Sequence, residues 1–331
     1  MHEYIFDTEL VRLSILVGVV ISLLVYNRYG VTTGGTVVPG YLALFVLQPT
    51  QILSTLALAT ATYVLVHKQL RPRFMLWGRK LFESEILVAL FLQILWIGVL
   101  IFLIPQTPEV TLLYGIGFLL PGIIAHDMGR QGVSNTLLAT VGCAVAVFSL
   151  VTIVGSVRDS FALPISMTGS GTETLTSFAY SGDLLLVGVG ISVLASIFLY
   201  HRSHFFESLR TGGFITAAYL GLVLNRPLDL LFIVICSALT YLIVTKILMK
   251  QAILFGRTKV AAMVLMGMIV TWSAELLLWY GMQYVPWAGF NAIAPMIIAL
   301  LANDAQRQGP KRTLIGATSA TLIVFCVLYW F

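Results

Sequence analysis

The sequence predicts an all-α, polytopic helical membrane protein with two tandem repeats of about six membrane segments each. Three observations predict it: the composition, the alternation of apolar runs with short polar connections, and the recurrence of rare residues at one spacing. The chain is 59% hydrophobic and 10% charged, whereas soluble domains carry roughly a quarter charged residues. A membrane β-barrel would instead show alternating segments of about ten residues.

Twelve apolar segments are expected, six on each side of a polar stretch. They cover residues 10–26, 34–47, 51–67, 82–104, 111–125, 133–155, 183–200, 211–224, 229–245, 260–281, 288–302 and 313–330. At about 1.5 Å per residue, segments as short as 34–47 and 111–125 reach only ~21–22 Å, less than the ~30 Å hydrocarbon core. These segments are expected to be short or interrupted helices.

The second half of the chain repeats the first. At an offset of 178 residues, Tyr41-Leu42 matches Tyr219-Leu220, Pro49 matches Pro227, Thr62-Tyr63 matches Thr240-Tyr241, and Gly78-Arg79 matches Gly256-Arg257. At 177, Asp127 matches Asp304, and Arg130-Gln131-Gly132 matches Arg307-Gln308-Gly309. The expected domains are a first repeat (1–155), a Ser/Thr/Gly-rich extracytoplasmic linker (156–182) and a degenerate second repeat (183–331).

Two Pro-Gly pairs interrupt the first repeat, at Pro39-Gly40 and Pro121-Gly122. Proline and glycine disfavour a continuous helix, and a broken segment in lipid needs protein or a water-filled cavity around its backbone. Three crossings separate the pairs, so they are expected to run in opposite directions, as inverted halves that meet at a site near the midplane. The alternative is that the pairs only let helices pack closely.

The second repeat has lost both pairs. Ala217-Ala218 and Ile298-Ala299 stand at the matching positions. An intact site is therefore expected in the first repeat, and replacement of Pro39-Gly40 by two alanines is expected to leave folding nearly intact.

The basic residues predict the orientation. Sixteen of the 19 Lys and Arg residues fall in the connections 27–33, 68–80, 126–132, 201–212, 246–259 and 303–312. The positive-inside rule places these loops in the cytoplasm and both termini outside. The net charge of +5 is thus explained by topology and contact with anionic lipid headgroups, without a nucleic-acid partner.

Polar and kink-forming residues near the interrupted segments are the candidates for a substrate path. They are Pro39, Gly40, Tyr41, Gln48, Pro121, Gly122, His126, Asp127, Arg130, Glu275, Asp304 and Arg307. An intramembrane acid such as Glu275 is a functional candidate, although its position also permits an interface location. For the Asp and Arg positions, the alternative is helix-end capping by a left-handed glycine at Gly132 or Gly309.

The cytoplasmic rings and cations are candidates for docking a partner, with membrane anchoring as the alternative. They are Arg71, Arg73, Trp77, Arg79, Lys80 and Arg257. The sequence has no Walker A motif, HExxH, nucleophile elbow or CxxC. No catalytic residue, metal site or cofactor is therefore expected, and His201 with His204 is interpreted as an interfacial pair.

The stretches GGTVVPGYLALFVLQP, LWGRK and GIGFLLPGIIAHDMGRQG resemble the PgsC/CapC family of poly-γ-glutamate capsule synthesis, well over 1–155 and more weakly over 183–331. The resemblance implies a subunit of a complex in the bacterial cytoplasmic membrane. Its partners would be an ATP-dependent PgsB/CapB-like ligase, which uses ATP and Mg, and a surface-exposed PgsA/CapA-like subunit. The duplication could replace a homodimer, serve another ligase, or accompany another polymer.

Two functions follow as hypotheses. The first is a non-catalytic membrane subunit of a γ-glutamyl polymer synthase and exporter. The second is a stand-alone secondary transporter of a small anion, which the inverted broken helices suggest. A neighbouring ligase gene favours the first, and its absence favours the second.

Overall fold

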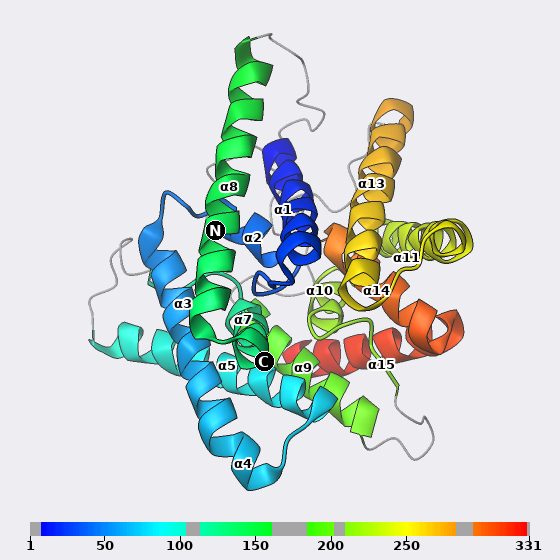
Figure 1. Cartoon of the computed structure of the whole chain (residues 1–331). Helices are drawn as coiled ribbons and strands as arrows, with labels where there is room; N and C mark the ends of the chain where they lie inside the picture. Colours follow the sequence, from blue (N-terminus) through cyan, green and yellow to red (C-terminus); the bar gives the residue numbers. More distant parts are fainter. Residues whose placement is uncertain (1–7, 104–112, 161–183, 202–208, 283–293, 330–331) are drawn as a thin grey trace. The chain divides into compact units, whose positions relative to one another are not determined.

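The computed structural model describes residues 8–103, 113–160, 184–201, 209–282 and 294–329. Every regular element in these ranges is a helix, which confirms the predicted all-α class. The chain divides into two compact units, Met1–Ile165 and Ser166–Phe331 (Figure 1).

The first unit begins with a long helix, α1, and ends with another, α8. Its elements are α1 (Thr8–Tyr29), α2 (Val38–Ala43), α3 (Pro49–Tyr63), the π-helix η1 (Val64–Leu70), α4 (Arg71–Phe74), α5 (Gly78–Leu103), α7 (Leu120–Gln131) and α8 (Val133–Ser160). The second unit has the same order of long and short helices. Its elements are α9 (Leu185–His201), α10 (Thr216–Leu222), α11 (Pro227–Leu242), the π-helix η4 (Ile243–Leu248), α12 (Met249–Gln251), α13 (Gly256–Met282), α14 (Ala294–Gln308) and α15 (Pro310–Tyr329).

Within the described ranges, seven helical stretches are long and apolar enough to cross a membrane. They are Glu9–Tyr29, Pro49–Phe74, Gly78–Leu103, Val133–Arg158, Pro227–Gln251, Gly256–Leu278 and Pro310–Tyr329. Of the other five predicted segments, one forms the 17-residue apolar helix α9. The remaining four form the short helices α2, α7, α10 and α14, with 6, 12, 7 and 15 residues.

Two short helices extend further along the chain than the hydrophobicity predicted. The segment expected at 111–125 forms a helix at Leu120–Gln131, and the one expected at 288–302 forms a helix at Ala294–Gln308. Proline in the first turn is compatible with a helix start, so Pro121 marks the beginning of α7. The polar residues that follow each apolar run continue the helix, and the expected boundaries were wrong for that reason.

Glycine ends both of these helices. Gly132 and Gly309 each have a φ of 91°, a value that favours glycine. Their N–H groups donate to the carbonyls of Met128 and Ala305, both at 2.9 Å. The predicted glycine stop is therefore found in both helices. The expected left-handed helical conformation was wrong for Gly132, because its ψ is 159°.

Both Pro-Gly helices pack through glycine against the long helix that precedes them. A Cβ atom on Gly40 would lie 2.7 Å from Cα of Ile15 on α1, and one on Gly122 would lie 3.1 Å from Cα of Ile86 on α5. The close-packing explanation thus holds for both glycines. It also corrects the expectation that alanines at positions 39 and 40 leave folding intact, because backbone atoms of α1 occupy the space that a Cβ atom at position 40 needs.

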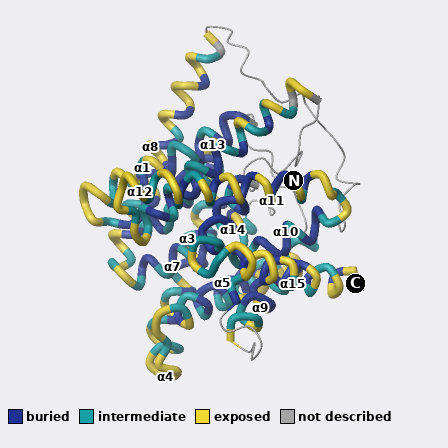
Figure 2. Tube along the Cα trace, turned by 90° about the vertical axis from the view of Figure 1, so that its right-hand side faces the viewer, coloured by how far each residue is buried: buried dark blue, intermediate teal, exposed yellow. Residues whose placement is uncertain are grey.

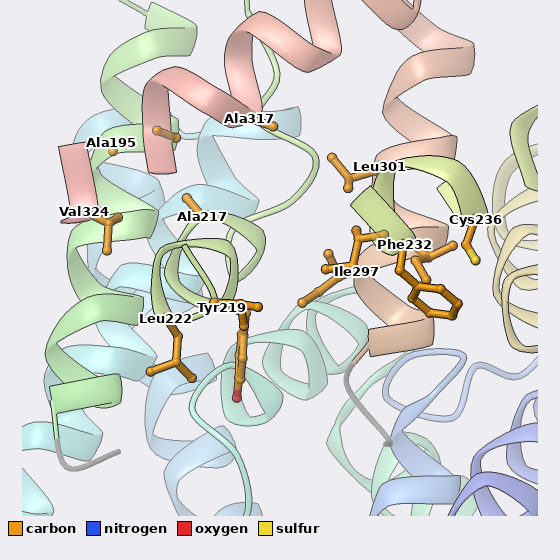
Figure 3. Packing of buried hydrophobic residues seen from close by; sticks show 14 of the residues in the cluster. Ala195, Ala217, Tyr219, Leu222, Phe232, Cys236, Ile297, Leu301, Ala317 and Val324 are labelled. Carbon is orange, nitrogen blue, oxygen red and sulfur yellow. The ribbon is translucent and has the colours of Figure 1, made fainter. Parts of the chain in front are cut away.

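In the second unit α13 and α14 also approach closely, but the glycine at the contact lies on the long helix α13 rather than on the short helix. A Cβ atom on Gly267 of α13 would lie 3.3 Å from Cβ of Ala299 on α14. The core beside it gathers small and branched side chains from five helices, among them Ala195, Ala217, Phe232, Ile297 and Ala317 (Figure 3). An alanine at position 299 is therefore accommodated because α13 has no side chain at the point of contact.

The predicted linker over 156–182 falls mostly outside the described residues. Its first five residues belong to the last turns of α8, which ends at Ser160. The hydroxyls of Ser156 and Ser160 donate to the carbonyls of Thr152 and Ser156, at 2.9 and 2.8 Å, so these serines are compatible with helix. His204, the second member of the predicted interfacial pair, also lies outside the described residues.

Candidate functional site

An irregular segment, residues 30–37, runs antiparallel to α7 in the first unit. Near its start, the Thr32 N–H donates to Oε1 of Gln131 at 2.7 Å, and Nε2 of Gln131 donates back to the Thr32 carbonyl. Further along, a Cβ atom on Gly34 would lie 3.1 Å from Ile124, and one on Gly35 would lie 2.8 Å from Ile123. Glycines therefore let this backbone lie directly on α7.

The same contacts recur in the second unit. Oε1 of Gln308 accepts from the Arg210 N–H at 2.8 Å, and Nε2 donates to the Arg210 carbonyl at 2.7 Å. Each glutamine also donates to a threonine hydroxyl on the following helix, at 2.9 Å for Gln131 to Thr136 and 3.0 Å for Gln308 to Thr313. The Arg-Gln-Gly motif is thus explained by its glutamine, which the sequence analysis did not select although both copies of the motif contained it.

The charged neighbours of these glutamines have different positions. Arg130 and Arg307 are exposed, whereas Asp127 and Asp304 are buried. Oδ2 of Asp304 accepts from the Gly212 N–H at 3.1 Å, and its Oδ1 lies 3.8 Å from NH1 of Arg210. Asp304 therefore fixes the glycine turn before α10, a structural role.

Replacement of Gln131 by alanine is expected to lower the stability of the first unit by about 2–3 kcal/mol, because buried backbone groups of Thr32 lose their partners. Thermal unfolding of the purified full chain in detergent measures this. Asn135→Ala is the matched control, since its amide donates to the Gln131 carbonyl at 3.2 Å from an exposed position. Equal losses for the two variants would contradict the assignment.

A second irregular segment, residues 113–119, leads into α7 and is held from two sides. The Ile116 N–H donates to Oγ1 of Thr55 on α3 at 2.7 Å. From α5, Nε2 of Gln93 donates to the Gly117 carbonyl at 3.2 Å, and Nε1 of Trp96 donates to the Leu113 carbonyl at 2.9 Å. The segment before the Pro121-Gly122 helix thus lies between α3 and α5.

Three glutamine side chains on or next to α3 and α5 carry buried atoms that lack a protein partner. Within the described residues, Oε1 and Nε2 of Gln51, Oε1 of Gln48 and Oε1 of Gln93 make no hydrogen bond. Gln51 is 0% exposed and lies one turn before Thr55 on the same face of α3, since Oγ1 of Thr55 donates to its carbonyl at 2.8 Å. Leaving such groups unsatisfied is costly, so Gln48, Gln51 and Gln93, hereafter the buried amides, have hydrogen-bonding capacity for a ligand or water.

In the second unit, charged residues stand at the positions equivalent to two of the buried amides. Arg226 and Asp229 stand 178 positions after Gln48 and Gln51. They form an ion pair, with Nε of Arg226 at 3.0 Å from Oδ2 of Asp229. The side chains at these two positions therefore form an ion pair in the second unit, whereas both amide atoms of Gln51 in the first unit make no hydrogen bond among the described residues.

A buried carboxylate lies between two imidazoles near the middle of α7. Oε1 of Glu85 is 2.7 Å from Nε2 of His67, and Oε2 is 2.7 Å from Nδ1 of His126. The exposed fractions of the three side chains are 0% for Glu85, 8% for His67 and 29% for His126. Gly129 makes this possible, because any Cβ there would overlap the His67 ring.

The sequence analysis selected His126 but missed His67 and Glu85. Glu85 stands in an apolar stretch and could have been found by the reasoning applied to Glu275. His67 lies on the π-helix η1, an element often found at functional sites. Its contact with Glu85 spans 18 residues and depends on the turn between α4 and α5.

The remaining path candidates occupy separate places. Pro39 and Gly40 are buried on α2, as are Pro121 and Gly122 on α7. Tyr41 is half-buried on α2. Glu275 is 6% exposed on α13 of the second unit. No group of three His, Cys, Asp or Glu side chains in the described ranges is arranged to hold a metal ion.

The docking candidates gather around the turn from α4 to α5, which Figure 2 draws as exposed. The guanidinium of Arg71 lies 4.5 Å from the ring centre of Trp77, and Nε of Arg79 lies 2.7 Å from Oε1 of Glu83. Arg73 and Lys80 are exposed. In the second unit, Arg257 follows the 76% exposed Phe255.

Comparisons with known proteins agree on one family. The family model described as Capsule biosynthesis CapC matches residues 17–137 and 191–314. The chain is 34% identical over 139 residues to the PGA biosynthesis protein CapC of Bacillus subtilis (strain 168), covering 42% of this chain and 91% of that relative. It is 33% identical over 142 residues to the Capsule biosynthesis protein CapC of Bacillus anthracis, covering 43% and 93%. No solved structure matches the chain.

Proposed function

Since the chain belongs to the CapC family of capsule biosynthesis proteins, we propose that it is a non-catalytic integral membrane subunit of a poly-γ-glutamate synthase and export complex. It acts in the bacterial cytoplasmic membrane, with both termini outside. Its partners are an ATP-dependent, CapB-like ligase that uses ATP and Mg, and a CapA-like surface subunit. The seven long apolar helices support the membrane placement.

The proposal includes a tandem duplication. Two separate stretches match the same family model, and each relative aligns with about 42% of the chain. The hydrogen bonds of Gln131 are reproduced by those of Gln308. Both observations support two copies of one unit, which together take the place of two subunits. The Pro-Gly helices α2 and α7, which both pack on the preceding long helix, support inverted halves inside the first copy.

The buried amides carry the proposal of a polymer path. A γ-glutamyl chain presents one secondary amide per residue, a donor and an acceptor that match glutamine side chains. A polyanion cannot cross hydrocarbon without a polar path. Gln93 contacts the segment that enters α7, Gln51 lies one turn before Thr55, which binds that segment, and all three glutamines belong to the unit that keeps both Pro-Gly pairs. The path therefore lies in the first unit.

The exposed cations and rings between α4 and α5 form the proposed docking surface for the ligase. Exchange of Arg73 and Lys80 for glutamine is expected to reduce co-purification of the ligase at low salt, since complementary charge steers association. The difference from the wild type is expected to shrink as salt rises, because salt screens exposed charges. Quantitative pull-down at several salt concentrations measures this. The control exchanges Lys311 and Arg312 on α15, and equal effects of both pairs would contradict the assignment.

A complementation experiment tests the proposed function. Cells that lack this chain but keep the ligase are expected to show no surface polymer, and a plasmid copy of the chain is expected to restore it. Polymer is measured separately on the surface and inside the cells with an antibody against γ-linked glutamate. Normal surface polymer in the absence of the chain would overturn the proposal.

A further inference from the structure

The charge of the Glu85 carboxylate needs compensation, because burial of an isolated charge is costly. The groups that face it come from three helical elements. His67 lies on η1, and Arg71 follows the last residue of that helix. His126 lies on α7, next to the buried Asp127 in the sequence. On its own helix, the neighbouring Glu83 bonds to Arg79 instead.

The hydrogen bonds indicate where the protons lie. NH1 of Arg71 is 3.4 Å from Nδ1 of His67, and a guanidinium can only donate. Nδ1 of His67 therefore accepts, and Nε2 carries the proton that is donated to Oε1 of Glu85. On the other side, Nδ1 of His126 donates to Oε2. His126 is the most exposed of the three, so its Nε2 is the atom that exchanges protons with the surroundings.

We propose that the cluster of His67, Glu85 and His126 is a proton-binding site whose occupancy is coupled to passage of the polymer. The proposal rests on the proposed function. A proton binds to Nε2 of His126, and the proton on Nδ1 moves to Oε2 of Glu85. The products are a neutral imidazole with its proton on Nε2 and a neutral carboxylic acid. Release follows the same steps in reverse, with no electron transfer.

Proton uptake changes the charge beside α7 by one unit. The same helix begins at the segment that contacts Gln93 and ends where Gln131 binds Thr32. A change of charge at His126 and Glu85 therefore acts on the element that connects the buried amides to the segment before α2. Carboxylate and histidine chains are used for this purpose in membrane transporters.

The second unit argues that the cluster has a role other than packing. At the positions 178 or 177 residues later, Thr245, Met263, Asn303 and Gln306 replace His67, Glu85, His126 and Gly129. None of the four replacements titrates, yet α13 still packs against α14. The contact between these helices therefore needs no ionisable group at the four positions, and Nζ of Lys259 on α13 donates to Oε1 of Gln306 at 2.7 Å instead. A metal site is also disfavoured, because each imidazole contacts the carboxylate at 2.7 Å rather than a shared point.

Glu85→Gln separates proton binding from packing. The amide has the shape of the carboxylic acid and can accept from one imidazole and donate to the other, so the variant is expected to fold with wild-type thermal stability. Proton uptake by the purified full chain is measured on a shift from roughly pH 8 to 5. The variant is expected to take up about one proton less per chain, and surface polymer is expected to fall about tenfold.

Glu83→Gln is the matched control and is expected to preserve proton uptake and polymer, since Glu83 contacts Arg79 rather than an imidazole. If Glu85→Gln does not fold, His126→Asn, the state of the second unit, replaces it with the same two measurements. Undiminished proton uptake would overturn the site while leaving the proposed function intact. Lost uptake with normal surface polymer would overturn the coupling.

Discussion

Alanine at position 40 is expected to destabilise the first unit by about 2–3 kcal/mol, since overpacking at a closed contact forces the backbone apart. Its Cβ atom would lie 2.7 Å from Cα of Ile15 and 2.8 Å from the Ser14 carbonyl oxygen, and neither backbone atom can rotate away. Movement of α2 would also stretch the 2.9 Å bond from Oγ of Ser14 to the Gly40 carbonyl. Thermal unfolding of the full chain in detergent measures the loss.

Gly142→Ala on α8 is the matched control. No atom lies within 4 Å of the Cβ position there, and α8 is helical at this residue. Alanine in a helix interior is favoured over glycine by roughly 0.5–1 kcal/mol, so this variant is expected to be slightly more stable. Similar melting temperatures for Gly40→Ala and Gly142→Ala would contradict the close contact between α1 and α2.

Methionine at position 51 is expected to lower surface polymer at least about tenfold without loss of stability. Methionine has nearly the length of glutamine and removes the amide atoms that no described residue satisfies. Their removal relieves a desolvation cost of about 1–3 kcal/mol, so the variant is expected to be at least as stable as the wild type. If Gln51 had only a structural role, the methionine variant would instead show lower stability and a normal amount of polymer per folded chain.

Ser237→Ala on α11 is the control for this prediction. Oγ of Ser237 is likewise buried without a partner among the described residues, but it belongs to the second unit. The substitution is expected to leave surface polymer unchanged. Surface polymer and membrane abundance of both variants are measured in the same cells, and an equal loss of polymer in both would contradict the placement of the path in the first unit.

Much of the fold could be predicted because local properties determine it. Continuous apolar runs give the long helices, and Pro121 with Gly132 sets the start and end of a short one. The boundaries of α7 and α14 were misplaced because hydrophobicity ends before the helix does. The polar turn that includes His126 is stabilised by contacts with α5, which no local pattern reveals.

The candidate site was predictable only in part. Gln48 and His126 were selected since they adjoin interrupted segments, and both lie where the structure concentrates buried polar groups. Glu85 and Gln51 act through partners or spaces formed by residues far away in the chain. Glu85 contacts His126, which lies 41 positions later in the chain. Gln51 lies one turn before Thr55, which binds Ile116 of the segment 61 positions later.

Transport into inverted membrane vesicles tests whether this chain gives the polymer its path across the membrane. Vesicles that contain the chain and its ligase are supplied with ATP and glutamate from outside, and a polymer-degrading hydrolase is then added. Polymer is expected to be protected inside wild-type vesicles and degraded with Gln51→Met, at equal total synthesis. Equal protection of polymer in both would contradict this path.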